Sequence, residues 1–252
     1  MCIRDRANAD DRLALSSHCE NGRQIQLTRR ELKQRVLRLA GWMRDNGIGR
    51  GDRVAAYITN TPETVIAMLA TAAVGAVFSS CSPDFGLGGA QDRCGQIEPK
   101  LLIACDGYNY AGKRFDRLEI VRKLAGSMPS VTRCLIVPFL ADSPDLSGLP
   151  GACLLEQAEQ GAPLEEFVRV GFNDPLYILY SSGTTGAPTC IVHGVGGVTL
   201  QHAKELRLHS NLGPDDRLFF FTTCGWMMWN WMVSGLLVGA SVITYEGNPF
   251  HP

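Results

Sequence analysis

Apolar residues recur at helical spacing in the first clear element of the chain, which covers residues 29–45. The residues that share this spacing are Leu32, Val36, Leu39 and Met43. A stripe of this kind predicts an amphipathic helix. Thr28 and Glu31 stand at capping-box spacing just before it, so we expect each side chain to bond a free backbone N–H at the helix start.

Short apolar runs then alternate with further helical segments. The predicted strands are 54–58, 76–80, 101–105 and 134–138, and the predicted helices are 61–74, 88–97 and 114–125. Strand–helix–strand units of this length predict right-handed crossovers and a largely parallel sheet. The expected fold class is therefore α/β, built from layered βαβ units.

The second half of the chain follows the same alternation after an irregular connection. Residues 141–170 are rich in proline and glycine and predict a surface connection with a short helix or turn. The elements expected after it are a strand at 175–180, a helix at 197–210, a strand at 217–222, a helix at 226–238 and a strand at 241–245.

Residues 218–245 carry no charged side chain and are long enough to cross a bilayer. Polar residues and glycines interrupt this stretch, and it divides into strand, helix and strand. We therefore expect a buried segment of a globular domain, with a membrane-spanning helix as the alternative. We expect no membrane among the partners of this protein.

Composition narrows the functional classes. Lys and Arg number 24 against 25 Asp and Glu, so no basic excess indicates nucleic acid as a partner. The nine cysteines show no CxxC spacing, and the five histidines form no ligand pattern, so no metal site is predicted. Without a recognisable signal peptide, reduced thiols and a cytoplasmic location are expected. The sequence does not define the oligomeric state.

Chemistry concentrates in the run from Tyr180 to Thr189, directly after a predicted strand. Between these two residues, its hydroxyl residues are Ser181, Ser182, Thr184 and Thr185, and its glycines are Gly183 and Gly186. Glycines let a backbone approach an anion, and consecutive N–H groups with added hydroxyls can surround phosphate oxygens. The run lacks the Gly-Lys-Ser/Thr of a Walker A loop. The alternative reading is a plain surface turn.

The longer string from Leu176 to Pro188 resembles the phosphate-loop signature [ST]-S-G-[ST]-T-G-x-P-K of the acyl-adenylate-forming synthetases. The resemblance continues through Cys190–Gly194. It is dense at residues 221–231, FTTCGWMMWNW, which are similar to the acetoacetate–CoA ligase branch of that family. It covers most of the chain from about residue 20, so residues 1–20 are set apart as an uncertain segment and residues 21–252 are expected to form part of the large amino-terminal domain.

The resemblance implies an enzyme that first joins an acid to AMP and then transfers the acyl group to CoA. ATP with Mg²⁺, CoA and acetoacetate are the implied substrates. The residues implied to hold ATP are Ser181, Ser182, Gly183, Thr184, Thr185, Gly186, Thr189 and His193. Thr189 departs from the family pattern, which has Lys there, and this loses a cation beside the triphosphate.

The resemblance also implies sites for the acid and for CoA. Trp226, Met227 and Met228 are expected to border the acid pocket, although a buried helix would explain the same residues. Phe85, Lys113 and Arg114 are expected to meet the CoA nucleotide, the alternative being a loop aromatic and a solvated basic pair. No protein nucleophile is needed, so no catalytic residue is assigned within this chain.

The family's adenine and ribose motifs, its hinge and its small carboxyl-terminal domain with the catalytic Lys are not found in this sequence. We therefore expect a fragment that does not complete the catalytic cycle alone. Two alternatives stay open: a related synthetase that acts on acetate or propionate, and a nucleotide-binding module without catalysis.

Overall fold

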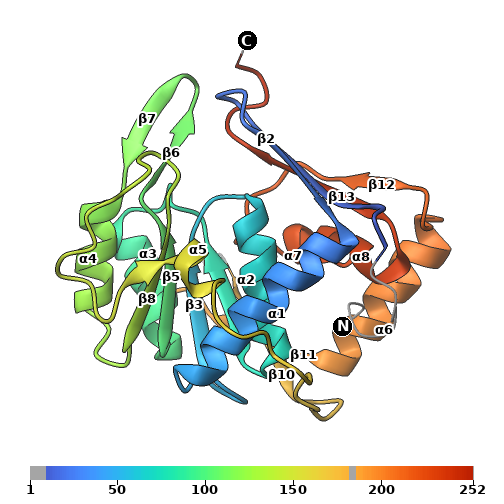
Figure 1. Ribbon diagram of the computed structural model, residues 1–252, viewed down its shortest axis with the longest axis horizontal. Helices are drawn as coiled ribbons and strands as arrows, with labels where there is room; N and C mark the ends of the chain where they lie inside the picture. Colours follow the sequence, from blue (N-terminus) through green and yellow to red (C-terminus); the bar gives the residue numbers. More distant parts are fainter. Residues whose placement is uncertain (1–9, 182–185, 252) are drawn as a thin grey trace.

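The computed structural model describes residues 10–181 and 186–251. Four of the proposed phosphate-loop residues lie outside the described residues: Ser182, Gly183, Thr184 and Thr185. The described residues form two larger sheets, a two-stranded hairpin and the helices packed against them (Figure 1).

A seven-stranded sheet forms the centre of the larger layer. Its strands, in spatial order, are β11 (Cys190–Gly194), β10 (Pro175–Tyr180), β4 (Val77–Cys81), β3 (Arg53–Tyr57), β5 (Leu101–Cys105), β8 (Arg133–Val137) and β9 (Cys153–Leu154). All neighbouring pairs are parallel except β10 and β11, which form an antiparallel hairpin around the phosphate-loop candidate. The predicted α/β class is confirmed.

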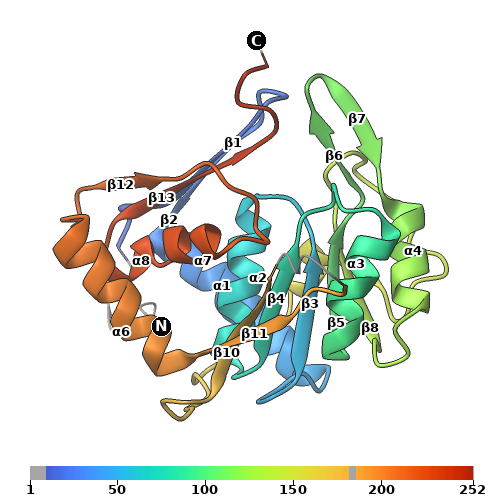
Figure 2. The same ribbon diagram turned by 180° about the vertical axis from the view of Figure 1, so that it is seen from behind.

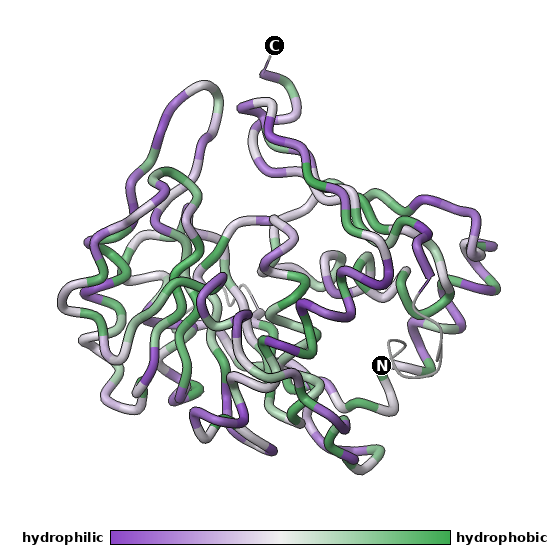
Figure 3. Tube along the Cα trace, viewed as in Figure 1, coloured by the Kyte–Doolittle hydropathy of each residue, from purple (hydrophilic) through white to green (hydrophobic). Residues whose placement is uncertain are grey.

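Helices cover both faces of this sheet. The helices of this layer are α1 (Arg29–Asp45), α2 (Pro62–Ala73), α3 (Leu87–Cys94) continuing as η1 (Gly95–Ile97), α4 (Leu118–Gly126) and α5 (Leu155–Ala158). On β3, Val54 and Ala56 belong to the apolar core beneath α1 and α2, while Ala55 and Tyr57 belong to the core beneath α3 and α4. Figure 2, the view from behind, shows the face of the sheet that α3 covers, and Figure 3 shows apolar residues gathered in the central strands.

A second sheet lies beside the first and joins the two ends of the chain. Its order is β12 (Arg217–Phe219), β13 (Ser241–Glu246), β1 (Leu13–Cys19) and β2 (Gln24–Thr28). The helices of this layer are α6 (Val195–Lys204), which continues as the π-helical turn η2 (Glu205–His209), α7 (Met227–Val233) and α8 (Gly235–Val238). The segment that we set apart, residues 1–20, thus contains β1, which pairs in parallel with β13.

Two sequence expectations on local structure are corrected. The expected helix at 114–125 starts later, because Lys113–Asp116 forms β7, which pairs with β6 (Gly107–Tyr110) in an antiparallel hairpin. The expected strand at 217–222 ends at Phe219. The capping box at Thr28 and Glu31 is confirmed, with both reciprocal hydrogen bonds present.

Residues 218–245 fold as strand, helices and strand, as expected for a globular domain. None of the helices within the described ranges is both long and apolar enough to cross a membrane.

Candidate functional site

The phosphate-loop candidate begins at the carboxyl end of β10, beside β4. The Ser181 amide donates to the Thr189 carbonyl oxygen at 3.0 Å, and the Thr189 amide donates to Ser181 Oγ at 3.3 Å. The base of the loop is therefore closed by two hydrogen bonds. Gly186 has φ +128°, a backbone conformation that only glycine adopts readily.

A further contact anchors the loop to the helical layer. Gln96, in η1, donates from Nε2 to the Pro188 carbonyl oxygen at 2.8 Å. Thr189 itself is exposed. Its hydroxyl can donate to an anion, but it offers no charge where the family signature has Lys.

The string before Trp226 is held against the carboxyl ends of β3 and β4. Ser80 Oγ donates to the Cys224 carbonyl oxygen at 2.8 Å, and Cys224 Sγ donates to the Ile58 carbonyl oxygen at 3.0 Å. Burial raises the pKa of the Cys224 thiol, so this thiol acts as a packed hydrogen-bond donor. Both signature strings thus lie at the carboxyl edge of the same parallel strands, where open α/β sheets bind ligands.

Asn60, which follows β3, connects this edge to the second sheet. Its Nδ2 donates to the carbonyl oxygens of Thr222 at 3.1 Å and Tyr245 at 3.3 Å, and its Oδ1 accepts from Trp229 Nε1 at 2.7 Å. Its backbone amide donates to Glu246 Oε2 at 2.7 Å. One buried side chain therefore fixes three segments.

A cavity of about 360 Å³ opens beside Asn60. Its lining comes from the ends of β3, β4 and β13, from the β6–β7 hairpin and from the string before Trp226. The lining residues are Ile58, Asn60, Ser82, Asp84, Tyr108, Tyr110, Phe115, Phe221, Thr222, Thr223, Cys224, Tyr245, Glu246 and Gly247. The wall of the cavity therefore combines aromatic rings with the carboxylates of Asp84 and Glu246.

Glu246 is the more perturbed of these carboxylates. Loss of water around the carboxyl raises its pKa to about 7, against the opposing hydrogen bond from the Asn60 amide, and the nearby Asp84 and Glu20 add to the rise. Near neutral pH this group therefore exists in both protonation states.

The proposed CoA residues surround this cavity rather than line it. Phe85 follows Asp84, and the Arg93 guanidinium lies 4.0 Å from its ring centroid, so one face of the ring is covered by a cation. Lys113 and Arg114 are exposed on β7, next to the lining residue Phe115.

Arg117 connects these two segments and was not recognised in the sequence. Its Nε donates to the Pro83 carbonyl oxygen at 2.8 Å and its Nη2 to the Tyr108 hydroxyl at 3.1 Å. Its guanidinium also lies 5.1 Å from the Tyr108 ring centroid. Arg117 thus links the loop that carries Phe85 to the hairpin that carries Lys113.

The proposed acid residues divide by exposure. Trp226 is 57% exposed at the start of α7, whereas Met227 and Met228 are partly buried and Trp229 is fully buried and stacked on Phe78. Trp226 and the two methionines thus present some surface, but the residues of this string that line the cavity beside Asn60 are 221–224.

His193 lies on β11 and its ring centroid is 5.0 Å from that of Tyr177. The pairing of Tyr177 with His193 stands three residue pairs from the loop end of the hairpin, about 10 Å along the strands. Burial lowers the pKa of His193. The structure therefore brings His193 against the core side of the hairpin and not to the base of the loop.

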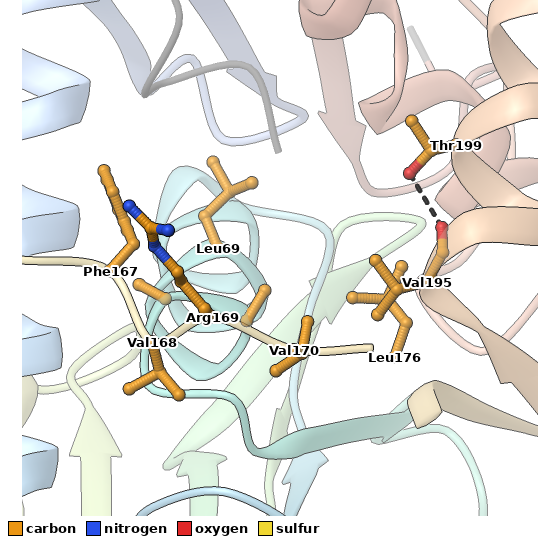
Figure 4. A pocket seen from close by; sticks show the side chains of 10 residues that line it. Leu69, Phe167, Val168, Arg169, Val170, Leu176, Val195 and Thr199 are labelled. Carbon is orange, nitrogen blue, oxygen red and sulfur yellow. Dashed lines mark hydrogen bonds between the residues drawn. The ribbon is translucent and has the colours of Figure 1, made fainter. Parts of the chain in front are cut away.

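A second cavity, of about 420 Å³, lies between α2 and α6 (Figure 4). Its lining is apolar except for Arg169 and Thr199, whose Oγ1 donates to the Val195 carbonyl oxygen at 2.7 Å. None of the proposed site residues lines it. Across the described residues, no cluster of three or more His, Cys, Asp or Glu is arranged to hold a metal ion.

The parallel sheet, with a Ser/Thr/Gly loop joined at its base and a Trp-rich string at one edge, is the arrangement of an adenylate-forming enzyme. The chain belongs to the AMP-binding enzyme family, whose model matches residues 4–252. It is 53% identical over 237 residues to the acetoacetyl-coenzyme A synthetase of Rhizobium meliloti (strain 1021), covering 90% of this chain and 35% of that protein.

Two further proteins are similar to the chain over nearly its whole length. The structure of acetoacetyl-CoA synthetase from Streptomyces lividans superposes with a TM-score of 0.93 at 41% identity, covering 100% of this chain and 38% of that one. A malonamoyl-CoA synthetase of Penicillium aethiopicum is 42% identical over 254 residues, covering 97% of this chain and 35% of that protein. The chain thus spans between 35% and 38% of the length of these three relatives.

Proposed function

We propose that this chain supplies the phosphate-, acid- and CoA-binding surfaces of an AMP-forming acid–CoA ligase that acts on acetoacetate. The observation that carries the proposal is the placement of the loop base and the Trp-rich string at one edge of parallel strands β10, β4 and β3. Two acetoacetyl-CoA synthetases among its relatives support acetoacetate as the acid.

The reaction would proceed in two substitutions. A carboxylate oxygen of the acid attacks the α-phosphorus of Mg-ATP, and the bond to pyrophosphate breaks. The CoA thiolate then attacks the acyl carbonyl carbon of the adenylate, and the bond to AMP breaks. Charge and position dominate such chemistry, so the protein contributes chiefly fixed donors.

We infer that the loop from Ser181 to Thr189, with Gly186 at its positive φ, holds the β- and γ-phosphates. The closed base and the Gln96 contact support this role, because fixed donors lose little entropy when a phosphate binds. Mg²⁺ would arrive with the nucleotide. The free thiols among the described residues are compatible with a cytoplasmic protein.

Isotope exchange between pyrophosphate and ATP tests the first half-reaction. The protein used joins this chain to the carboxyl-terminal remainder of the Rhizobium meliloti relative. We expect exchange that requires acetoacetate, with kcat/KM for acetate and propionate at least about tenfold lower. Preference for acetate or propionate would favour the related synthetase instead.

Calorimetric titration of the chain itself with ATP tests the remaining alternative, a nucleotide-binding module without catalysis. ATP binding to the chain, together with no acid-dependent exchange by the joined protein, would indicate a nucleotide-binding module without catalysis. The joined protein requires a folding check by thermal unfolding, because loss of structure would also abolish exchange.

The acid pocket makes a separate prediction. Met227→Ala together with Met228→Ala frees space at the start of α7. The ratio of kcat/KM for a larger 3-oxo acid to kcat/KM for acetoacetate should therefore rise by about threefold or more. Met128→Ala, at a buried position that follows α4 in the chain, serves as a methionine control. An unchanged ratio in the joined protein would remove these residues from the acid pocket.

A further inference from the structure

Glu20, at the end of β1, joins three segments that are distant in sequence. Its carboxylate accepts backbone N–H groups from Ala111 at 3.0 Å, from Gly112 at 3.0 Å and from Asn248 at 2.7 Å. Ala111 and Gly112 form the tip of the β6–β7 hairpin, and Asn248 follows β13. One acidic side chain thus ties the hairpin tip to the second sheet.

The hairpin tip offers suitable donors for this contact. Tyr110 pairs with Lys113, so the loop between the strands has two residues, and both have positive φ, +52° at Ala111 and +71° at Gly112. In a two-residue turn of this kind, the amides of the central residues have no partner across the hairpin. The carboxylate satisfies both of them, and bonds to a charged acceptor are stronger than neutral ones.

Charge and packing support a persistent contact. The three N–H donors lower the pKa of Glu20 although partial burial acts in the opposite direction, so the carboxylate is ionised at neutral pH. A Cβ on Gly112 would meet His251 Nε2 at 2.8 Å, which shows how closely the carboxyl-terminal residues approach the tip.

The hairpin needs such an anchor because two strands alone are marginally stable in water. Its base is held by Arg117, whose Nη2 bonds the Tyr108 hydroxyl. Its tip carries Lys113 directly after the turn, followed by Arg114. The positions of the Lys113 and Arg114 side chains therefore depend on the contacts that fix Ala111 and Gly112.

We propose that Glu20 is a positioning residue for CoA: by binding the amides of the hairpin tip, it holds Lys113 and Arg114 where they meet the phosphates of the CoA nucleotide. This rests on the proposed function, since it assumes that the CoA-binding surface includes Lys113 and Arg114. Glu20 touches no substrate and acts through the hairpin.

Steady-state kinetics of the joined protein test this role. Glu20→Ala should raise KM for CoA about tenfold and leave KM for ATP within about twofold, because the hairpin tip and Asn248 lose their acceptor while the hydrogen bonds at the base of the phosphate loop remain. Glu20→Gln keeps one acceptor oxygen and should recover most of the loss. Glu166→Gln, an exposed glutamate before β10, is the matched control.

Hydrogen exchange on the chain gives an independent readout. The amides of Ala111, Gly112 and Asn248 should exchange at least about tenfold faster in Glu20→Ala, while those of β5 should be unchanged. Faster exchange at the tip with unchanged KM for CoA would overturn the proposal, since the contact would then be structural alone.

The failure of the CoA site is distinguishable from the failure of this inference. Lys113→Ala and Arg114→Ala together should also raise KM for CoA. If they do not, the CoA site itself is misplaced and the proposal falls with it. If they do and Glu20→Ala does not, the site stands and Glu20 has no part in it.

Discussion

Asn60 shows how one residue can organise a site without belonging to a recognised motif. Its amide side chain uses both its donors and its acceptor to hold Thr222, Tyr245 and Trp229. These partners are more than 160 residues away in sequence. No local pattern marks such a residue, because its partners are assembled only by the fold.

Replacing Asn60 with alanine should therefore be costly. Asn60→Ala leaves the Trp229 indole N–H and two carbonyl oxygens without their present partner, and we expect the free energy of unfolding to fall by about 2–4 kcal/mol. Urea unfolding of the chain measures this. Exposed Asn173→Ala is the control, and an equal loss in both variants would contradict the role given to Asn60.

Glu246 predicts a dependence of stability on pH. Its pKa is raised to about 7 in the folded chain, above the unfolded value of 4.5. The stability it contributes is therefore fully present below pH 4.5 and is lost as pH rises through 7. The loss is at most about 3 kcal/mol, from the size of the shift.

Glu246→Gln should remove this loss, so the variant gains stability relative to the parent chain between pH 5 and 8. The measurement is the difference in unfolding free energy between the two chains across this range, which cancels the opposite effect of His202, whose pKa burial lowers to about 4. A difference that is constant with pH would show that Glu246 titrates normally.

At the scale of elements, the sequence predicted regular helices and buried strands well. The helix at 29–45 has the bounds expected, because its apolar stripe and its capping box agree. The β6–β7 hairpin was missed because Tyr108 and Phe115 are separated by polar residues, and the run 114–125 also fits a helix. Its turn, Ala111-Gly112, lacks the Asn-Gly or Asp-Gly signal that marks such hairpins.

That missing signal leads to a prediction for the hairpin. Ala111 adopts φ +52°, which costs an alanine about 1 kcal/mol or more. Asn tolerates this conformation better, so Ala111→Asn should raise the free energy of unfolding by about 0.5–1 kcal/mol. Thermal unfolding checks it, and Ala141→Asn, in an exposed loop position, is the control. No gain at position 111, or an equal gain at position 141, would contradict strain at Ala111.

The sequence also predicted the phosphate loop and the Trp-rich string, but it did not show that they meet at one sheet edge. Strand order decides this, since β10 lies beside β4 although about 95 residues separate them. The resemblance placed His193 with the loop residues. The hairpin pairing puts its ring against Tyr177, three residue pairs from the loop end of the strands.

On the scale of the whole molecule, β1 occupies an interior position of the second sheet, between β13 and β2. Its residues Ala14 and Leu15 are buried in the main core. Removal of residues 1–20 should therefore lower the free energy of unfolding by at least about 3 kcal/mol, because β2 and β13 lose their common neighbour. A chain lacking residues 1–6 is the control. Unchanged cooperative unfolding of the shorter chain would contradict this role of β1.

The parallel pairing of β1 with β13 also sets an order of events during synthesis. Leu15 pairs with Val242, so β1 leaves the ribosome long before its partner has been made. At about 5–20 residues per second, the interval is roughly 10–50 s. Throughout this time the edge of β1 that later pairs with β13 has no partner. An open strand edge of this kind can pair with another chain and lead to aggregation. Translation speed across the last third of the chain should therefore influence the yield of folded protein.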